Sequence, residues 1–248
     1  MTTASAVQDR EGRARDSDAE TMQSHGIPFT IHPMTTQTTQ LDAAHFDSKA
    51  RQWDDNPLFR ERGLKIADAV RQAVPLNQGM TALDYGCGTG LLSFPLKDAL
   101  GTILMADSSG GMLEVVNEKI AAQGVRNMTT QQLDLLAGPV PTQRFDLIVT
   151  AMTLHHVPDT DRILSIFHDL LKPGGHLCIA DLDQEDGSFH GPEVDVHHGF
   201  DRAGLGRRAA QAGFAAVQFQ TVFSIAKERD RGTQDYPVFL LTARREDA

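Results

Sequence analysis

Three glycines at alternate positions, Gly86, Gly88 and Gly90, separate a short apolar run from a longer one. Residues 80–85 have the length of a buried strand, and residues 91–100 are enough for a helix. Because glycine has no β-carbon, the chain can turn sharply here, and its backbone can approach a ligand at the positive end of the helix dipole. The sequence therefore predicts a strand, a tight turn that binds a nucleotide-like ligand, and a helix.

Alternating strands and helices are predicted along the rest of the chain. The strands are expected at 101–107, 128–133, 145–150 and 176–180, and the helices at 109–123, 160–171 and 201–212. Two further β-rich runs, 216–225 and 236–243, are separated by a charged loop, 227–235, and indicate an antiparallel pair at one sheet edge. Strands that are apolar on both faces imply a parallel sheet covered on both sides. The predicted fold class is α/β: a Rossmann-like, doubly wound, mostly parallel sheet with an antiparallel C-terminal hairpin, in three layers, α/β/α.

Three segments are expected in the 248 residues. Residues 1–40 are rich in Thr, Ser, Gln and Asp without apolar periodicity, which is typical of a flexible tail. Residues 41–78 predict two helical pieces, interrupted near Pro57, that form a lid or N-terminal extension. Residues 79–248 are expected to form the ligand-binding domain.

Charge and cysteine usage limit the partners and the compartment. The 33 acidic and 23 basic side chains give a formal net charge of -10, which disfavours binding to nucleic acid or to an anionic membrane. Cys87 and Cys178 form no zinc-type spacing and are interpreted as reduced, buried thiols. There is no run of 18 apolar residues, and the N-terminus lacks the order of a secretory signal. We expect a cytoplasmic monomer or homodimer that acts on a small molecule.

The residue before the glycine turn helps to choose the ligand. Asp84 stands two positions ahead of Gly86, and Leu91 occupies the position of the third glycine in the dinucleotide pattern GxGxxG. A carboxylate here would repel a pyrophosphate and favour a ligand that carries a cation, such as S-adenosylmethionine. A glycine motif alone is a weak signal, so a nucleotide-dependent oxidoreductase stays open as an alternative.

Residues 83–90 resemble motif I of the class I S-adenosylmethionine-dependent methyltransferases, and the likeness extends over residues 81–243. The resemblance is to small-molecule members of the ubiquinone and menaquinone biosynthesis type. It implies S-adenosylmethionine as cofactor and S-adenosylhomocysteine as product. Asp107 would bind the ribose hydroxyls, and Asp134 would lie near the adenine amino group. The candidate cofactor-binding residues are Asp84, Gly86, Cys87, Gly88, Gly90, Asp107, Ser108, Met112, Asp134, Leu135 and Ala151.

Two adjacent histidines are the candidate catalytic residues. Methyl transfer is an in-line displacement, so the protein has to align the reactants, exclude water and remove any proton from the acceptor. His155 and His156 follow the fourth predicted strand, whose carboxyl end faces the ligand in an open parallel sheet. An imidazole can accept a proton near neutral pH. We prefer His155, although the spacing does not decide, and capping or packing roles remain open.

Candidate acceptor contacts and a lid complete the predicted site. Asp181, Asp183 and His190 follow the fifth predicted strand, in a wider acidic and histidine-rich region that contains Glu185, Asp186, His197 and His198. This region could orient a cationic amine, and we predict no metal because no compact ligand spacing is present. Trp53 is the candidate lid residue, with Phe46 and Arg60 nearby, since its ring can cover a sulfonium by cation–π attraction. Core packing is the alternative.

The predicted function is transfer of a methyl group to a small-molecule acceptor. The alternatives are a nucleotide-dependent oxidoreductase and a non-catalytic, cofactor-binding regulatory protein. The sequence leaves open the acceptor and the attacked atom, which can be oxygen, sulfur, nitrogen or carbon.

Overall fold

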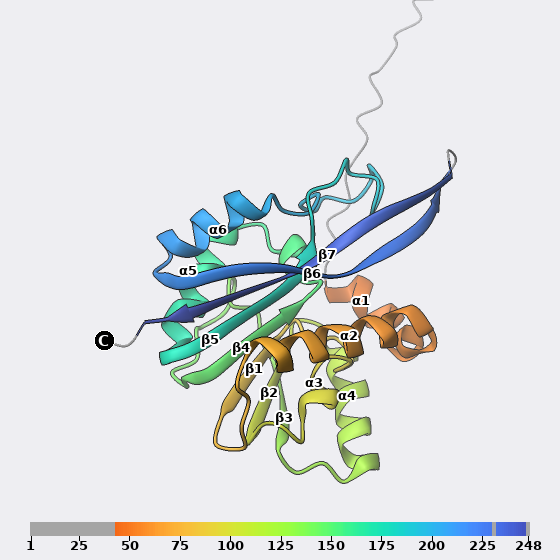
Figure 1. Ribbon diagram of the computed structural model, residues 1–248. Helices are drawn as coiled ribbons and strands as arrows, with labels where there is room; N and C mark the ends of the chain where they lie inside the picture. The colour runs from red at the N-terminus through yellow and green to blue at the C-terminus, as the bar shows by residue number, and fades with distance from the viewer. Residues whose placement is uncertain (1–42, 230–231, 247–248) are drawn as a thin grey trace, which may run out of the picture. The chain divides into compact units, whose positions relative to one another are not determined.

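The structure of the protein is a computed structural model that describes residues 43–229 and 232–246. The predicted tail, residues 1–40, lies outside the described residues. Within them, one seven-stranded sheet has the order β3-β2-β1-β4-β5-β7-β6 (Figure 1). Its strands are β1 (Thr81–Tyr85), β2 (Thr102–Asp107), β3 (Met128–Gln132), β4 (Phe145–Ala151), β5 (Leu171–Leu182), β6 (Phe214–Arg229) and β7 (Gly232–Arg245).

Strand directions confirm the predicted sheet. β1 to β5 pair in parallel, and β7 runs antiparallel to both β5 and β6. The chain therefore has the Rossmann-like parallel arrangement and the antiparallel C-terminal hairpin that the apolar runs indicated.

Helices cover both faces of the sheet (Figure 1). Successive side chains of β1 point to opposite faces of the sheet, since Ala82 packs in one buried hydrophobic cluster and Leu83 in the other. The first cluster includes side chains from α2 (Pro57–Ala73), α3 (Ser93–Leu96) and α4 (Gly110–Gln123). The second includes side chains from α5 (Thr160–Leu170) and α6 (Arg202–Gln211). The three-layer prediction is confirmed.

The helix predicted at 91–100 is shorter than expected, because α3 covers only Ser93–Leu96. The carbonyl groups of Lys97 and Leu100 accept hydrogen bonds from the side-chain amide of Asn127, at 2.7 and 3.1 Å. A side chain from another part of the chain thus satisfies these groups, and the segment runs into β2 as turns.

The predicted charged loop at 227–235 is also wrong, because the two strands of the hairpin continue through it. Lys227 pairs with Gln234, and Arg229 pairs with Gly232. The guanidinium of Arg229 reaches the Tyr236 hydroxyl and the Ser188 carbonyl oxygen. These contacts, one of them to the loop after β5, hold the charged residues in an extended strand, although the local sequence predicts a loop for them.

The N-terminal helical segment breaks where Pro57 predicts. It comprises α1 (Ala43–Lys49), the 3-10 helix η1 (Ala50–Asp55) and then α2, with the Asn56 side chain accepting from the Leu58 backbone N–H. The Asp47 carboxylate ties this segment to the start of α4, where it accepts from the Ser109 hydroxyl. No helix in the described ranges is long and apolar enough to cross a membrane.

Candidate active site

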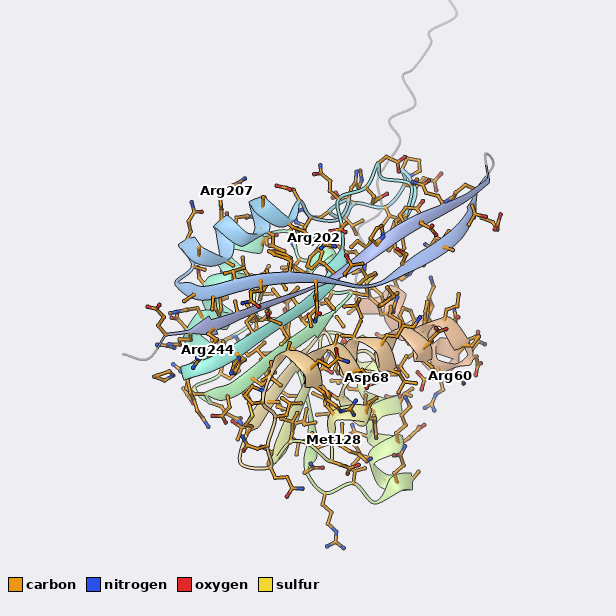
Figure 2. All side chains as sticks on the ribbon, viewed as in Figure 1. Arg60, Asp68, Met128, Arg202, Arg207 and Arg244 are labelled. Atoms are coloured by element: carbon orange, nitrogen blue, oxygen red, sulfur yellow. The ribbon has the colours of Figure 1, made fainter. Side chains whose placement is uncertain are left out.

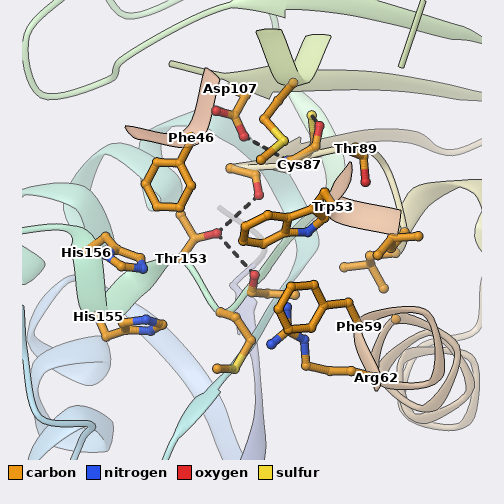
Figure 3. A pocket seen from close by; sticks show the side chains of 18 of the residues that line it. Phe46, Trp53, Phe59, Arg62, Cys87, Thr89, Asp107, Thr153, His155 and His156 are labelled. Atoms are coloured by element: carbon orange, nitrogen blue, oxygen red, sulfur yellow. Dashed lines mark hydrogen bonds between the residues drawn. The ribbon is translucent and has the colours of Figure 1, made fainter. Parts of the chain in front are cut away.

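A pocket of about 1440 Å³ opens beyond the carboxyl ends of β1, β2 and β4 (Figure 3). Residues of the N-terminal helical segment line it on one side, and the loop after β5 contributes to the other. This is the edge at which open parallel sheets bind ligands. The pocket is large enough for a nucleoside together with a second small molecule.

The glycine turn forms one wall, and its three glycines have different roles although all have positive φ angles, of 69, 52 and 85°. A β-carbon on Gly86 would lie 2.3 Å from the Thr153 side chain, and one on Gly90 would lie 2.6 Å from Met105. A β-carbon on Gly88 would meet nothing within 4 Å. Gly88 therefore borders open space, whereas Gly90 packs against the core and does not line the pocket.

Asp107 ends β2 and joins the turn to the start of α4. One carboxylate oxygen accepts from the Gly88 backbone N–H at 2.8 Å, and the other accepts from the Ser109 N–H at 2.9 Å. Burial raises the pKa of Asp107 against the lowering effect of these bonds. Each carboxylate oxygen keeps a further lone pair, so the group can accept from two neighbouring hydroxyls. Ser108 and Met112 line the pocket beside it.

The segment after β3 also borders the pocket. Asp134 lines it, and its carboxylate accepts from the backbone N–H groups of Leu136 and Ala137 at 2.8 and 3.2 Å. Leu135 is fully buried outside the lining, with its N–H donating to the Tyr85 hydroxyl at 3.3 Å. Leu136 lines the pocket in place of the predicted Leu135.

The charge state of Asp84 differs from the permanently ionised carboxylate that the sequence suggested. Asp84 is buried and accepts from the Ser93 hydroxyl at 2.6 Å. Burial raises its pKa to about 7, so the carboxyl group is partly protonated near neutral pH. A partly protonated carboxyl group attracts a cationic ligand less than the ionised carboxylate that the sequence suggested. Cys87 and Ala151 line the pocket too, and both cysteines are free and buried as predicted.

The histidines lie at the other end of the pocket (Figure 3). His155 and His156 belong to the 3-10 helix η2 (Leu154–His156), which closely follows β4. His155 is buried, and its Nδ1 lies 2.6 Å from an oxygen of Asp181 at the end of β5. Its Nε2 lies 3.1 Å from Nε2 of His190, which comes from the loop after β5. Asp181 does not line the pocket, but it contacts the His155 ring, which does.

His156 is held between aromatic rings and lacks a polar partner on one nitrogen. Its ring packs edge-on against Phe46, with centroids 5.4 Å apart, and lies 4.1 Å from the His155 ring. Within the described part of the chain, its buried Nδ1 has no hydrogen-bond partner. Burial and then the neighbouring imidazoles lower the pKa of His156 to about 2 and that of His190 to about 4. Both rings are therefore neutral near pH 7.

Aromatic residues of the N-terminal segment also line the pocket (Figure 3). Trp53 packs against Phe59 and Phe46, with ring centroids 4.8 and 6.1 Å apart. Arg60, the cation suggested by the sequence, is exposed and outside the lining (Figure 2). Arg62 lines the pocket instead, with its guanidinium 4.7 Å from the Phe59 ring centroid and its pKa lowered to about 10 by burial. The i, i+3 spacing from Phe59 is the signal that would have identified it.

The predicted acidic and histidine-rich region is divided by the structure. Asp183 forms two bonds to the Arg202 guanidinium, at 2.6 and 2.7 Å, and lies outside the pocket lining. The Glu185 carboxylate accepts from the Phe189 backbone N–H at 2.9 Å. Both contacts hold the loop after β5. Of the acidic and histidine residues predicted in this region, His190 lines the pocket. The members outside the lining are Asp181, Asp183, Glu185, Asp186, His197 and His198.

Comparisons with known proteins agree with this geometry. Residues 82–175 match a protein family described as a methyltransferase domain. The chain is 30% identical over 178 residues to the ubiquinone biosynthesis O-methyltransferase of Dinoroseobacter shibae, a match that covers 63% of this chain and 70% of that protein. It is 36% identical over 121 residues to an uncharacterized methyltransferase of Schizosaccharomyces pombe, covering 46% of this chain and 42% of that protein. The chain thus spans less than half of the yeast relative.

Solved structures give the same fold. A SAM-dependent methyltransferase from Aquifex aeolicus superposes with a TM-score of 0.60, over 80% of this chain and 98% of that chain, at 22% sequence identity. At this identity the likeness concerns the fold alone.

Proposed function

The chain belongs to the class I S-adenosylmethionine-dependent methyltransferases, and we propose that it transfers the methyl group of this cofactor to a small-molecule acceptor. The observation that carries the proposal is one pocket with two chemically different ends. Asp107 and the open space at Gly88 form one end, and the histidines form the other. A nucleoside-binding end and a proton-accepting end are what methyl transfer to a protic acceptor requires.

We assign the nucleoside to the end formed by the glycine turn. The Asp107 carboxylate can accept from both ribose hydroxyls while its backbone partners hold it in position. Asp134 lines the same end and remains our candidate for the adenine side. With the adenosine there, the sulfonium would lie toward Thr153 and the histidines.

The transfer itself needs alignment more than covalent help from the protein. A lone pair of the acceptor attacks the methyl carbon in line with the carbon–sulfur bond, and the bonding electrons return to sulfur to give S-adenosylhomocysteine. Trp53 and Phe46 would exclude water from this space. The histidine end would assist the loss of a proton from the acceptor, which the Asp181–His155 contact supports.

The walls favour an acceptor with an aromatic or apolar body. Phe46, Trp53 and Phe59 line the pocket, so a flat ring could stack against them. The name of the Dinoroseobacter relative indicates ubiquinone biosynthesis and transfer to oxygen. We therefore propose a hydroxylated aromatic compound as the first class to test. The cytoplasmic location and the monomeric or homodimeric state stay predictions.

The decisive experiment is to incubate the protein and a cell extract with S-adenosylmethionine labelled in the methyl group. Mass spectrometry should find one labelled small molecule with the wild-type protein and much less of it with Gly88→Ala, whose new methyl group would enter the cofactor space. Cofactor binding without any labelled product would favour the non-catalytic alternative. Tight binding of NAD without binding of S-adenosylmethionine would favour the oxidoreductase.

A further inference from the structure

Three imidazoles meet at one end of the pocket, two from the 3-10 helix η2 and one from the loop after β5. One nitrogen each from His155, His156 and His190 lies within 4.8 Å of the other two. We propose that these three histidines bind a divalent transition-metal ion of the zinc type, with one coordination position open to the pocket.

The spacing of the nitrogens fits such an ion. Zinc–nitrogen bonds are about 2.0–2.1 Å, so two imidazole nitrogens in a tetrahedral site lie about 3.3 Å apart. Nε2 of His155 and Nε2 of His190 are already 3.1 Å apart. One nitrogen of His156 lies within 4.8 Å of the other two ligand atoms, so it would move closer to them when an ion binds.

The unpartnered nitrogen of His156 is an independent observation. Its Nδ1 is buried and finds no hydrogen-bond partner in the part of the chain that the structure describes. Buried polar atoms are almost always paired, so an exception calls for an ion or a water molecule that completes the site. An ion bound by Nδ1 of His156 and by the two neighbouring imidazoles would supply that partner.

Asp181 supplies the outer contact that metal-binding histidines usually have. Its carboxylate accepts the proton on Nδ1 of His155 at 2.6 Å, which leaves the lone pair of Nε2 facing His190. A carboxylate–histidine pair of this kind fixes the ring and makes its free nitrogen a better ligand. The loop that carries His190 is held as well, since Lys227 donates to the carbonyl oxygen of Phe189 at 2.9 Å.

The ligand type narrows the choice of metal. Imidazole nitrogens suit zinc, cobalt, nickel, copper and iron, whereas magnesium and calcium prefer oxygen ligands. Three histidines and an open fourth position are typical of catalytic zinc sites. Local spacing predicts no such site because His155 and His190 are 35 residues apart and come together only in the folded chain.

The role of the ion in activating the methyl acceptor rests on the proposed function, whereas the binding of the ion to the three histidines does not. An acceptor hydroxyl or thiol that takes the open position would lose its proton to solvent more readily. The resulting oxygen or sulfur lone pair would form the bond to the methyl carbon as the carbon–sulfur bond of the cofactor breaks. The electron pair of that bond would go to the cofactor sulfur.

Titration with Co²⁺ tests the site without any knowledge of the acceptor. The full chain, freed of metal by chelator and dialysis, is titrated while the visible absorption of bound Co²⁺ is followed, and Zn²⁺ is then added as competitor. We expect one ion per chain, displaced by Zn²⁺. His190→Ala should weaken binding at least about 100-fold, since a lost ligand costs more than a change in the residue that orients it. His168→Ala, a matched control on α5 that packs against Phe214, should bind like the wild type.

The outcomes separate this inference from the proposed function. Absence of Co²⁺ absorption in the wild type, or unchanged affinity in both His190→Ala and His156→Ala, would overturn the site. Thermal unfolding of the metal-free variants checks that each is folded. Labelled methyl transfer that continues at the wild-type rate after metal removal would overturn the activating role and leave the proposed function intact.

Discussion

The Asp181 carboxylate holds His155 by both its ring and its backbone. One oxygen lies 2.6 Å from Nδ1 of the ring, and the other accepts from the backbone N–H at 3.2 Å. The first contact places the proton of the neutral imidazole on Nδ1 and leaves Nε2 as the unprotonated nitrogen. A fully buried side chain at the end of β5 thus sets the tautomer of a ring that lines the pocket.

Replacing this carboxylate should reduce turnover more than cofactor binding. We expect Asp181→Asn to lower kcat about 10- to 100-fold, because the amide no longer fixes the His155 tautomer. The KM for S-adenosylmethionine should change less than about threefold, a split between kcat and KM that general loss of structure would not produce. Steady-state kinetics with the acceptor found by methyl labelling provide the measurement.

Asp183→Asn is the matched control for that variant. Asp183 lies two residues further along, but it pairs with Arg202 and lies outside the pocket lining. Replacing Asp183 should cost at most about 1 kcal/mol of stability. Because its contact with Arg202 holds the loop that carries His190, the variant should lower kcat somewhat, but much less than Asp181→Asn does. Equal losses of kcat in the two variants would contradict a specific role for Asp181.

The glycine turn allows a test that separates backbone strain from cofactor binding. Gly88 and Gly124 have similar φ angles, 52 and 61°, and a β-carbon on either would meet nothing within 4 Å. Gly88→Ala and Gly124→Ala should therefore both lose about 1 kcal/mol in urea unfolding. Only Gly88→Ala places a methyl group in the cofactor space, and its affinity for S-adenosylhomocysteine should fall about 10- to 100-fold by calorimetry. A similar loss of affinity in Gly124→Ala would contradict the assignment of the glycine turn to the cofactor-binding site.

Trp53 is the single tryptophan of the chain, so tryptophan fluorescence reports on this part of the pocket lining alone. Saturable changes in emission are expected when S-adenosylmethionine binds, because Trp53 lines the pocket. In Trp53→Leu, affinity for S-adenosylmethionine should fall about 10-fold through loss of the cation–π contact to the sulfonium. Affinity for S-adenosylhomocysteine, whose sulfur is neutral, should fall less. Equal losses for the two ligands would favour a packing role.

Local sequence patterns predicted the architecture well because the sheet depends on local signals. The apolar run of β4 and the glycine turn after β1 each specify their conformation within a few residues. The order of the strands in the sheet was not predicted, because local periodicity does not contain it, and it comes from the structure. The same local reasoning was wrong where distant contacts decide, as with the carbonyl groups of Lys97 and Leu100 that Asn127 satisfies.

The site was predicted less completely for the same reason. The path of the chain after β5 is set by contacts such as the pairing of Asp183 with Phe200, which has no local sequence signal. That path brings His190 to His155 and leaves Glu185 outside the pocket. Arg62 is a different case, because helical phase within α2 is a local signal and would have placed Arg62, rather than Arg60, in the pocket lining.

Asp84 gives a pH dependence whose sign follows from its buried environment. Burial raises the pKa of its carboxyl group from 3.8 to about 7 in the folded protein. Between these values the folded state keeps a proton that the unfolded state has lost, so rising pH favours unfolding. The stability of the wild type relative to Asp84→Asn should therefore fall by about 3 kcal/mol between pH 5 and 8, since the extra proton is held over about two pH units, from 5 to 7, at about 1.36 kcal/mol per pH unit. Urea unfolding of the cofactor-free proteins across this range measures the difference.

A second carboxylate with the opposite shift serves as the control for this prediction. Burial raises the pKa of Asp146, but bonds from Lys172 and Thr81 outweigh that effect and lower it. Its stabilising contribution is present above the unfolded pKa and is lost only as the pH falls through the lowered folded value. Between pH 5 and 8 the difference between the wild type and Asp146→Asn should therefore stay constant. A flat difference for Asp84→Asn as well would mean that the Asp84 carboxyl is ionised throughout this range, and that a full negative charge lies beside the glycine turn.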